Sequence, residues 1–211
     1  MADLDQRERA ELCDLFLRLG PDAATLCDGW TTRHLAAHLA IRERDLRAGP
    51  GILFGGVFAR FTDKLMAKEM RRVYENIVAR VRVPPPGPLS IAPLRAAMSF
   101  VEYLVHHEDV RRANGEVPRT DRADLQAETW KQLGRLSKLM ALKARTGRTL
   151  ELVATGTTTG HFRVGKGPVV TLTGEPVELL LYLEGRRAAA RVVSTGAPDD
   201  VAAVEAGNFG V

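Results

Sequence analysis

The sequence has few cysteines and no long apolar run. Cys13 and Cys27 are the only cysteines in 211 residues, and the start of the chain lacks the basic and apolar regions of a secretory signal. We therefore expect a cytoplasmic protein in which both cysteines are reduced, small, buried residues. No stretch approaches about 18 consecutive apolar residues, which predicts that the chain does not span a membrane.

Several motifs with well-understood chemistry are also missing. The chain has no G-x-S-x-G, P-loop, C-x-x-C or Rossmann glycine motif, so the sequence does not support the chemistries that depend on them. Its net charge is +4 and its pI is near 9.3, but acidic residues are interspersed with the basic ones. Because a nucleic-acid binder more often gathers its positive charge on one face, we expect no nucleic-acid partner.

The first two thirds of the chain show helical periodicity. Leu12, Leu15, Phe16 and Leu19 follow the i, i+3, i+4, i+7 pattern, and a Gly-Pro pair ends the segment. Similar patterns predict helices over residues 5–19, 31–47, 57–81, 93–113 and 121–142. We expect these segments to pack as a four-helix bundle with one extra helix.

The pattern changes near Thr146 and Gly147. Beyond this point, short apolar or alternating segments are separated by turns. They predict strands over residues 149–155, 161–165, 168–174 and 188–196, and helices over 176–185 and 198–207. The predicted fold class is therefore α plus α+β, with a helical bundle over 1–145 and a small α+β domain over 146–211.

The segment VEYLVHHEDVRR, residues 101–112, places several ionisable side chains on a helix that faces the core. Glu102, His106 and Asp109 are spaced i, i+4, i+7 and project from nearly the same side. Glu102 and His106 flank the apolar arc, where a carboxylate needs a partner. That partner is either a divalent metal ion shared with His106 or the His106 imidazolium itself, and Asp109 could orient the imidazole from behind.

The second predicted helix offers further histidines in the segment HLAAH. His34 lies early, near the helix cap or exposed, whereas His38 lies a turn deeper among apolar residues, so we favour His38 as a third ligand. We expect His107 to be a surface histidine and His161 a strand or turn histidine. Three protein ligands leave one position open, which is typical of a catalytic rather than a structural metal site.

Three segments resemble the DinB/YfiT-like metal-binding superfamily, in its mycothiol-dependent maleylpyruvate isomerase-like branch. LCDGWTTRHLAAHLA, 26–40, resembles that branch's G-W-[TS]-x-x-x-x-x-x-H-L motif, and FVEYLVHHEDV, 100–110, resembles its E-x-x-x-H-x-x-D motif. LTGEPVELLLYLEGRRAA, 172–189, resembles its sterol-carrier-like α+β domain. The chain departs from these motifs at His34, commonly Asp, and at His107, commonly Gly, and neither departure affects the three ligands.

The resemblance implies a DinB-like bundle and assigns roles to particular residues. His38, Glu102 and His106 become the ligands of zinc or another divalent metal ion, with water in the fourth position. Trp30 is then expected to pack within the bundle. Arg186, from the C-terminal domain, becomes a candidate for binding an anionic substrate.

The resemblance also implies a function. The metal ion would lower the pKa of a low-molecular-weight thiol such as mycothiol, and the thiolate would serve a transferase or isomerase acting on a small electrophilic molecule. One alternative is a non-catalytic, metal-dependent protein that binds a small ligand. Another is a helical interaction module with an internal Glu–His pair and no metal. We expect a monomer or a homodimer.

Overall fold

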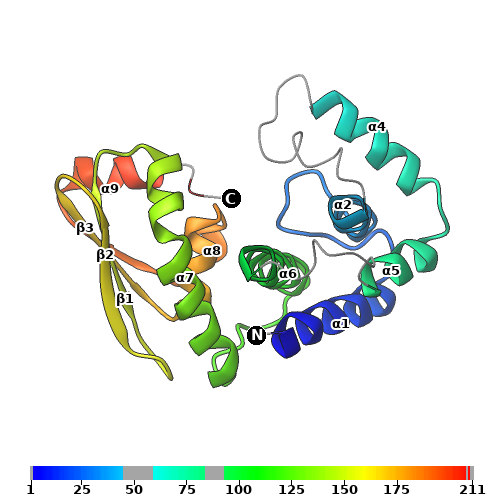
Figure 1. Ribbon diagram of the computed structural model, residues 1–211, viewed down its shortest axis with the longest axis horizontal. Helices are drawn as coiled ribbons and strands as arrows, with labels where there is room; N and C mark the ends of the chain where they lie inside the picture. Colours follow the sequence, from blue (N-terminus) through cyan, green and yellow to red (C-terminus); the bar gives the residue numbers. More distant parts are fainter. Residues whose placement is uncertain (1, 45–58, 84–92, 208, 210–211) are drawn as a thin grey trace. The chain divides into compact units, whose positions relative to one another are not determined.

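The computed structural model describes residues 2–44, 59–83, 93–207 and 209 (Figure 1). It divides into two compact units, Met1–Val117 and Pro118–Val211. The first unit is helical and the second combines helices with a four-stranded sheet, which confirms the mixed helical and α+β character predicted from the sequence. None of the described helices combines the length and the apolar character needed to cross a bilayer.

The first unit is built on a core shared by four helices. Its helices are α1 (Ala2–Leu19), α2 (Thr32–Arg44), α4 (Ala59–Met70), α5 (Tyr74–Arg82) and α6 (Pro93–Ala113). Phe16 of α1, Leu35 of α2, Ile77 of α5 and Tyr103 of α6 are all fully buried in that core. Trp30 packs against the same cluster, as expected. The bounds of α6 agree with the predicted helix over 93–113. Glu102, His106 and Asp109 therefore lie on one regular helix, as their i, i+4, i+7 spacing assumes.

The helix predicted over 57–81 is divided in two, and its first two residues lie outside the described part of the chain. The break falls at residues 71–73, where Val73 has an extended ψ of 135°. Arg33 of α2 donates hydrogen bonds to the carbonyl oxygens of Met70 and Arg72, at 3.2 and 3.1 Å. These long-range donors satisfy carbonyls that the end of α4 leaves without helical partners. The apolar periodicity continues through the break and therefore does not reveal it.

The second unit is a mixed sheet with helices against it. Its elements are α7 (Ala123–Ala144), β1 (Thr149–Ala154), β2 (Gly160–Gly165), β3 (Val169–Gly174), α8 (Pro176–Leu183), the 3-10 helix η3 (Arg187–Ala189), β4 (Val193–Thr195) and α9 (Pro198–Glu205). The strand order is β2-β1-β3-β4, with β1 and β3 parallel and the other pairs antiparallel. Leu150 and Leu152 of β1 and Val170 and Leu172 of β3 are buried, which is the alternation expected of a sheet with one covered face.

The division between the units differs from the predicted boundary between residues 145 and 146. Helix α7 belongs to the second unit, where it lies along the sheet beside α8 (Figure 1). The ring of Trp130 packs on Phe162 of β2 at 4.8 Å, and the Gln126 side chain accepts a hydrogen bond from the backbone N–H of Val177 at 3.1 Å. Periodicity identifies a helix but not the surface against which it packs. The change in composition after α7 therefore does not coincide with the division between the two units.

The strand predicted over 188–196 is shorter in the structure. Only Val193–Thr195 forms strand β4, because residues 187–189 form η3 before it. The backbone N–H of Arg191 donates to the buried Glu178 carboxylate at 2.7 Å. This contact joins the segment before β4 to α8, and β4 then pairs with β3.

A buried cation connects the helices of the first unit. The Arg9 guanidinium forms two hydrogen bonds with the Glu43 carboxylate, at 2.7 and 2.6 Å, and a third with the carbonyl of Val81 at 2.7 Å. It also lies over the ring of Tyr103, 4.2 Å from its centroid. Asp5 is buried beside this group, and its Oδ1 has no hydrogen-bond partner among the described residues. Burial raises the pKa of Asp5 to about 6, with the Arg9 charge opposing the shift and the Glu43 charge adding to it.

The raised pKa of Asp5 predicts that its own contribution to the stability of the first unit is lost as pH rises. The folded state holds the Asp5 proton more tightly than the unfolded state, whose pKa is 3.8, so the stabilising contribution is present below pH 4 and is lost by about pH 6. A shift of this size corresponds to about 3 kcal/mol. The Asp5→Asn variant is therefore expected to be more stable than the parent protein at pH 7.5, with a much smaller difference at pH 4.5. Urea unfolding at both pH values tests this, and an equal difference at the two values would contradict it.

Candidate metal centre

Two imidazole nitrogens, one from each of two helices, converge on one carboxylate oxygen. His38 Nε2, from α2, lies 3.0 Å from Glu102 Oε1, and His106 Nε2, one turn along α6, lies 3.3 Å from the same oxygen. The His38 and His106 rings meet edge to face, with their centroids 5.4 Å apart. The structure thus brings together the three side chains that the sequence selected as metal ligands.

The start of α2 explains why His38 rather than His34 reaches Glu102. His34 Nδ1 accepts a hydrogen bond from the backbone N–H of Thr31 at 3.2 Å, which turns its ring back to the beginning of the helix. This confirms the expected position of His34 near the helix cap. His38 lies one turn further along, between the buried side chains of Leu35 and Leu39.

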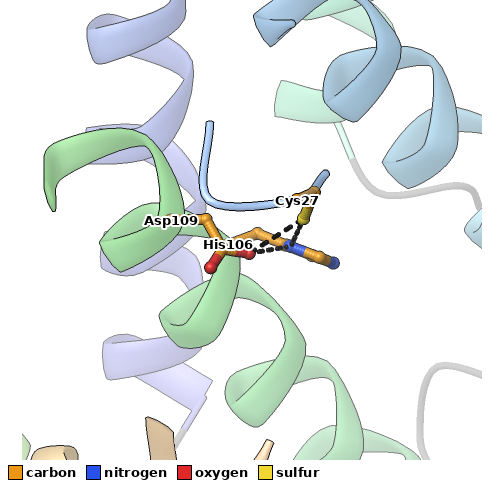
Figure 2. A group of neighbouring side chains, drawn as sticks. All are labelled: Cys27, His106 and Asp109. Carbon is orange, nitrogen blue, oxygen red and sulfur yellow. Dashed lines mark hydrogen bonds and ion pairs between the residues drawn. The ribbon is translucent and has the colours of Figure 1, made fainter. Parts of the chain in front are cut away.

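Behind His106 lies a second group of polar side chains (Figure 2). Asp109 Oδ2 is 2.8 Å from His106 Nδ1, and its side chain is completely buried. The Cys27 thiol donates to the same Asp109 oxygen at 3.2 Å, and its sulfur lies 3.9 Å from His106 Nδ1. Because Asp109 accepts a hydrogen bond from Nδ1–H, Nε2 of the neutral ring keeps the lone pair that a metal ion needs.

The two cysteines differ in their surroundings. Cys13 is a fully buried residue of the core, and burial raises its pKa to about 12. Cys27 is only partly buried and contacts the polar pair of Asp109 and His106, so the expectation that both are small apolar core residues is wrong for Cys27. Its place just before the Asp-Gly turn and the Gly-Trp motif puts it near α2, but no local pattern indicates its contact with α6.

The ionisation of the group follows from competition between burial and hydrogen bonding. Burial alone would raise the pKa of Glu102, but hydrogen bonds from His106 and His38 and the charge of Arg42, whose Nε is 3.2 Å away, hold that pKa well below its usual range. At His38, burial lowers the pKa of the imidazole, and it outweighs the hydrogen bond to Glu102, which acts to raise that pKa. At His106, burial is outweighed by hydrogen bonds to Asp109, Cys27 and Glu102, and the pKa is raised.

This donor set suits a divalent metal ion. The two imidazole nitrogens and the carboxylate oxygen lie within 4.8 Å of one another. Two histidines and one carboxylate are a combination found in catalytic zinc sites, where a fourth position remains for water or substrate. Without an ion, the same contacts form the internal Glu–His pair that the sequence left open as an alternative.

His107 is not the surface histidine that was expected. It is 4% exposed, and its Nδ1 lies 2.9 Å from Oε2 of Glu8, a fully buried carboxylate on α1. Glu11 adds a second carboxylate to this group, whose ligand atoms also lie within 4.8 Å of one another. The position after His106 turns the side chain about 100° around α6, toward α1. His161, in contrast, is an exposed residue of β2, as expected.

Two features of the second unit bear on ligand binding. Arg186 follows α8 and donates to the carbonyl of Glu184 at 2.6 Å, and its role toward a substrate stays a prediction. A concave region of about 600 Å³ lies around the end of α7 and of β2. Its cationic lining residues are Lys138, Arg145, Arg148, Arg163 and Lys166. No carboxylate, imidazole or thiol is among its lining residues, so this region offers no metal ligands.

Comparison with known proteins identifies the fold. No protein-family model and no curated protein matches the sequence. Two solved structures share the fold: mycothiol-dependent maleylpyruvate isomerase, at 20% identity and a TM-score of 0.59, and a histidine-to-alanine variant of that enzyme, at 18% and 0.60. Each match covers 92% of this chain and 90% of the other. The mixed fold, helical in its first unit and α+β in its second, is therefore one that this chain shares with the isomerase structures.

The burial of His107 predicts a structural role that an exposed histidine does not have. Replacing His107 with Ala removes a partner of the buried Glu8 carboxylate and is expected to lower the free energy of unfolding by about 3 kcal/mol. The matched control is His161→Ala, on the exposed face of β2, with an expected effect within about 0.5 kcal/mol. Urea unfolding followed by circular dichroism measures both. Equal, small effects would show that the Glu8–His107 contact adds no stability.

Proposed function

We propose that this protein binds a divalent metal ion, zinc in the first instance, through His38, Glu102 and His106, and that it is a metal-dependent thiol transferase or isomerase. Its substrates would be a low-molecular-weight thiol of the mycothiol type and a small electrophilic molecule. The observation that carries the proposal is the convergence of His38 Nε2 and His106 Nε2 on Glu102 Oε1. The helices that share the core, α1, α2, α5 and α6, are proposed as the bundle that holds these ligands.

Charge supports an anionic fourth ligand in preference to a neutral one. Glu102 is the only carboxylate among the three ligands, so it balances one of the two charges of a divalent ion. Arg42, 3.2 Å from Glu102 Oε1, adds a further positive charge. An anion entering the open position would therefore be stabilised by the surrounding field.

The chain's own residues prepare the site for a thiol. Asp109 holds Nδ1–H of His106, which fixes the ring orientation and keeps Nε2 directed toward Glu102. A metal ion bound there would lower the pKa of a coordinated thiol and so supply a nucleophile at neutral pH. Free thiols of this kind persist in reducing compartments, which supports the proposal that the activity is cytoplasmic.

Two fold neighbours support the choice of thiol chemistry. Both are described as mycothiol-dependent maleylpyruvate isomerase, an enzyme that depends on a thiol. Maleylpyruvate is therefore the first electrophile to test, followed by other small unsaturated acids. At 18–20% identity the likeness supports the reaction class more than the substrate, so the panel needs chemically different electrophiles.

The proposed ligands predict the metal content of specific variants. Tag-free protein is expected to contain about one zinc or similar ion per chain, and the His38→Ala and Glu102→Gln variants, purified without added metal, are expected to lose it while remaining folded. His107→Gln is the matched control, because it alters the neighbouring histidine of the same helix and leaves the three ligands intact. Elemental analysis measures all four proteins. Retention of metal by Glu102→Gln, or its loss from His107→Gln alone, would show that the ion does not bind at the three proposed ligands.

The proposed activity predicts that turnover requires both metal and thiol. Mycothiol with maleylpyruvate, or with another electrophile of the panel, is expected to react only with the metal-loaded protein. Asp109→Asn is expected to lower metal affinity about 10- to 100-fold, because it weakens the support of His106. Chromatographic detection of product measures turnover. Thiol binding without turnover would favour a ligand-binding protein, and no metal after reconstitution would favour the internal Glu–His pair.

A further inference from the structure

The imidazole of His106 has a different set of neighbours at each nitrogen. Nε2 lies 3.3 Å from Glu102 Oε1, in the proposed metal centre. Nδ1 lies 2.8 Å from Asp109 Oδ2 and 3.9 Å from Cys27 Sγ, in the group shown in Figure 2. The second group has a thiol that the proposed function does not use.

The loop that carries Cys27 is fixed to α6 by its backbone. The N–H of Leu26 donates to the carbonyl oxygen of Asp109 at 3.1 Å. Thr25 Oγ1 accepts from the N–H of Cys27 at 3.1 Å and lies 2.9 Å from the carbonyl oxygen of Trp30. These contacts hold the sulfur beside Asp109 and His106, so its position does not depend on one flexible side chain alone.

The donor atoms match a divalent ion in both charge and spacing. A thiolate and a carboxylate together balance a charge of two, and a neutral imidazole completes the set. The three atoms are 3.2, 3.9 and 2.8 Å apart. Around a tetrahedral zinc ion such atoms lie about 3.3 to 3.6 Å apart, so shifts of about half an ångström would accommodate an ion. The sulfur favours thiophilic ions over magnesium or calcium.

We propose that Cys27, Asp109 and Nδ1 of His106 form a second cation site, selective for thiophilic divalent ions such as zinc, cobalt or cadmium. An ion there takes the place of the thiol proton and the Nδ1 proton that now face Asp109. The thiol proton passes to solvent or buffer, the proton of the neutral ring moves from Nδ1 to Nε2, and no oxidant or reductant is involved.

The second site competes with the first for one ring, a consequence that rests on the proposed function. A neutral imidazole has one nitrogen lone pair. When Nδ1 binds an ion, the ring proton resides on Nε2, which then cannot bind the ion held by His38 and Glu102. Occupation of the Cys27 site therefore removes a ligand from the proposed catalytic centre and makes an excess of thiophilic metal inhibitory.

The test uses Co²⁺ alone as the probe, because a thiolate bound to Co²⁺ gives an intense near-ultraviolet charge-transfer band that nitrogen and oxygen ligands do not give. In His38→Ala, where the first centre has lost a ligand, the band is expected to appear on titration with Co²⁺. In His38→Ala with Cys27→Ser, the band is expected to disappear and Co²⁺ affinity to fall by at least about tenfold. Cys13→Ser is the matched control and is expected to leave the band unchanged, because Cys13 is fully buried elsewhere in the core.

The outcomes separate the second site from the first. Absence of a thiolate band in folded His38→Ala at excess Co²⁺, or its persistence after Cys27→Ser, would overturn the Cys27 site and reduce Cys27 to a hydrogen-bond donor to Asp109. Failure of the proposed function is detected separately, as absence of bound metal in the Cys27→Ser single variant, which keeps all three ligands of the first centre. The parent protein is expected to bind one ion per chain, and two ions per chain would overturn the competition.

Discussion

The Glu102 carboxylate is the constraint on which the first unit depends. It lies within the helical unit with its side chain only 16% exposed, and a carboxylate in such a place is stable only with compensating partners. His38 from α2, His106 from α6 and Arg42 from α2 supply them. The group therefore links two segments more than sixty residues apart in the sequence, and its charge balance decides whether the site serves as an ion pair or as a metal centre.

The two nitrogens of His106 have neighbours of different charge. On the Nε2 side, one carboxylate is joined by two imidazoles and an arginine, which leaves excess positive charge once a divalent ion is bound. On the Nδ1 side, Asp109 and Cys27 form a set that can neutralise such an ion completely. The first arrangement favours an incoming anionic ligand such as a thiolate, whereas the second leaves no net charge to attract one. In the proposed account, one ring thus lies between a site suited to thiol activation and a site whose occupation inhibits it.

The sequence was informative where chemistry and local periodicity coincide. The i, i+4, i+7 spacing of Glu102, His106 and Asp109 lies within one regular helix, so their common direction could be predicted, and His38 followed from its depth in α2. The position of Cys27 depends on a loop folding back on α6, which leaves no periodic signal. The contact of His107 with Glu8 depends on which helix packs behind α6, and the assignment of α7 depends on the sheet that follows it. These contacts are long-range, and the local patterns of the sequence do not specify them.

We propose that the first ion bound lies between His38, Glu102 and His106 and accepts a thiol. Zinc-edge X-ray absorption spectroscopy of protein loaded with one equivalent of zinc, before and after addition of mycothiol, tests this most directly. We predict a shell of nitrogen and oxygen ligands at about 2.0 to 2.1 Å, including two imidazoles, and the appearance of one sulfur at about 2.3 Å when the thiol is added. A sulfur already present before addition would place the ion at Cys27, and a shell unchanged by the thiol would contradict thiol activation at this centre.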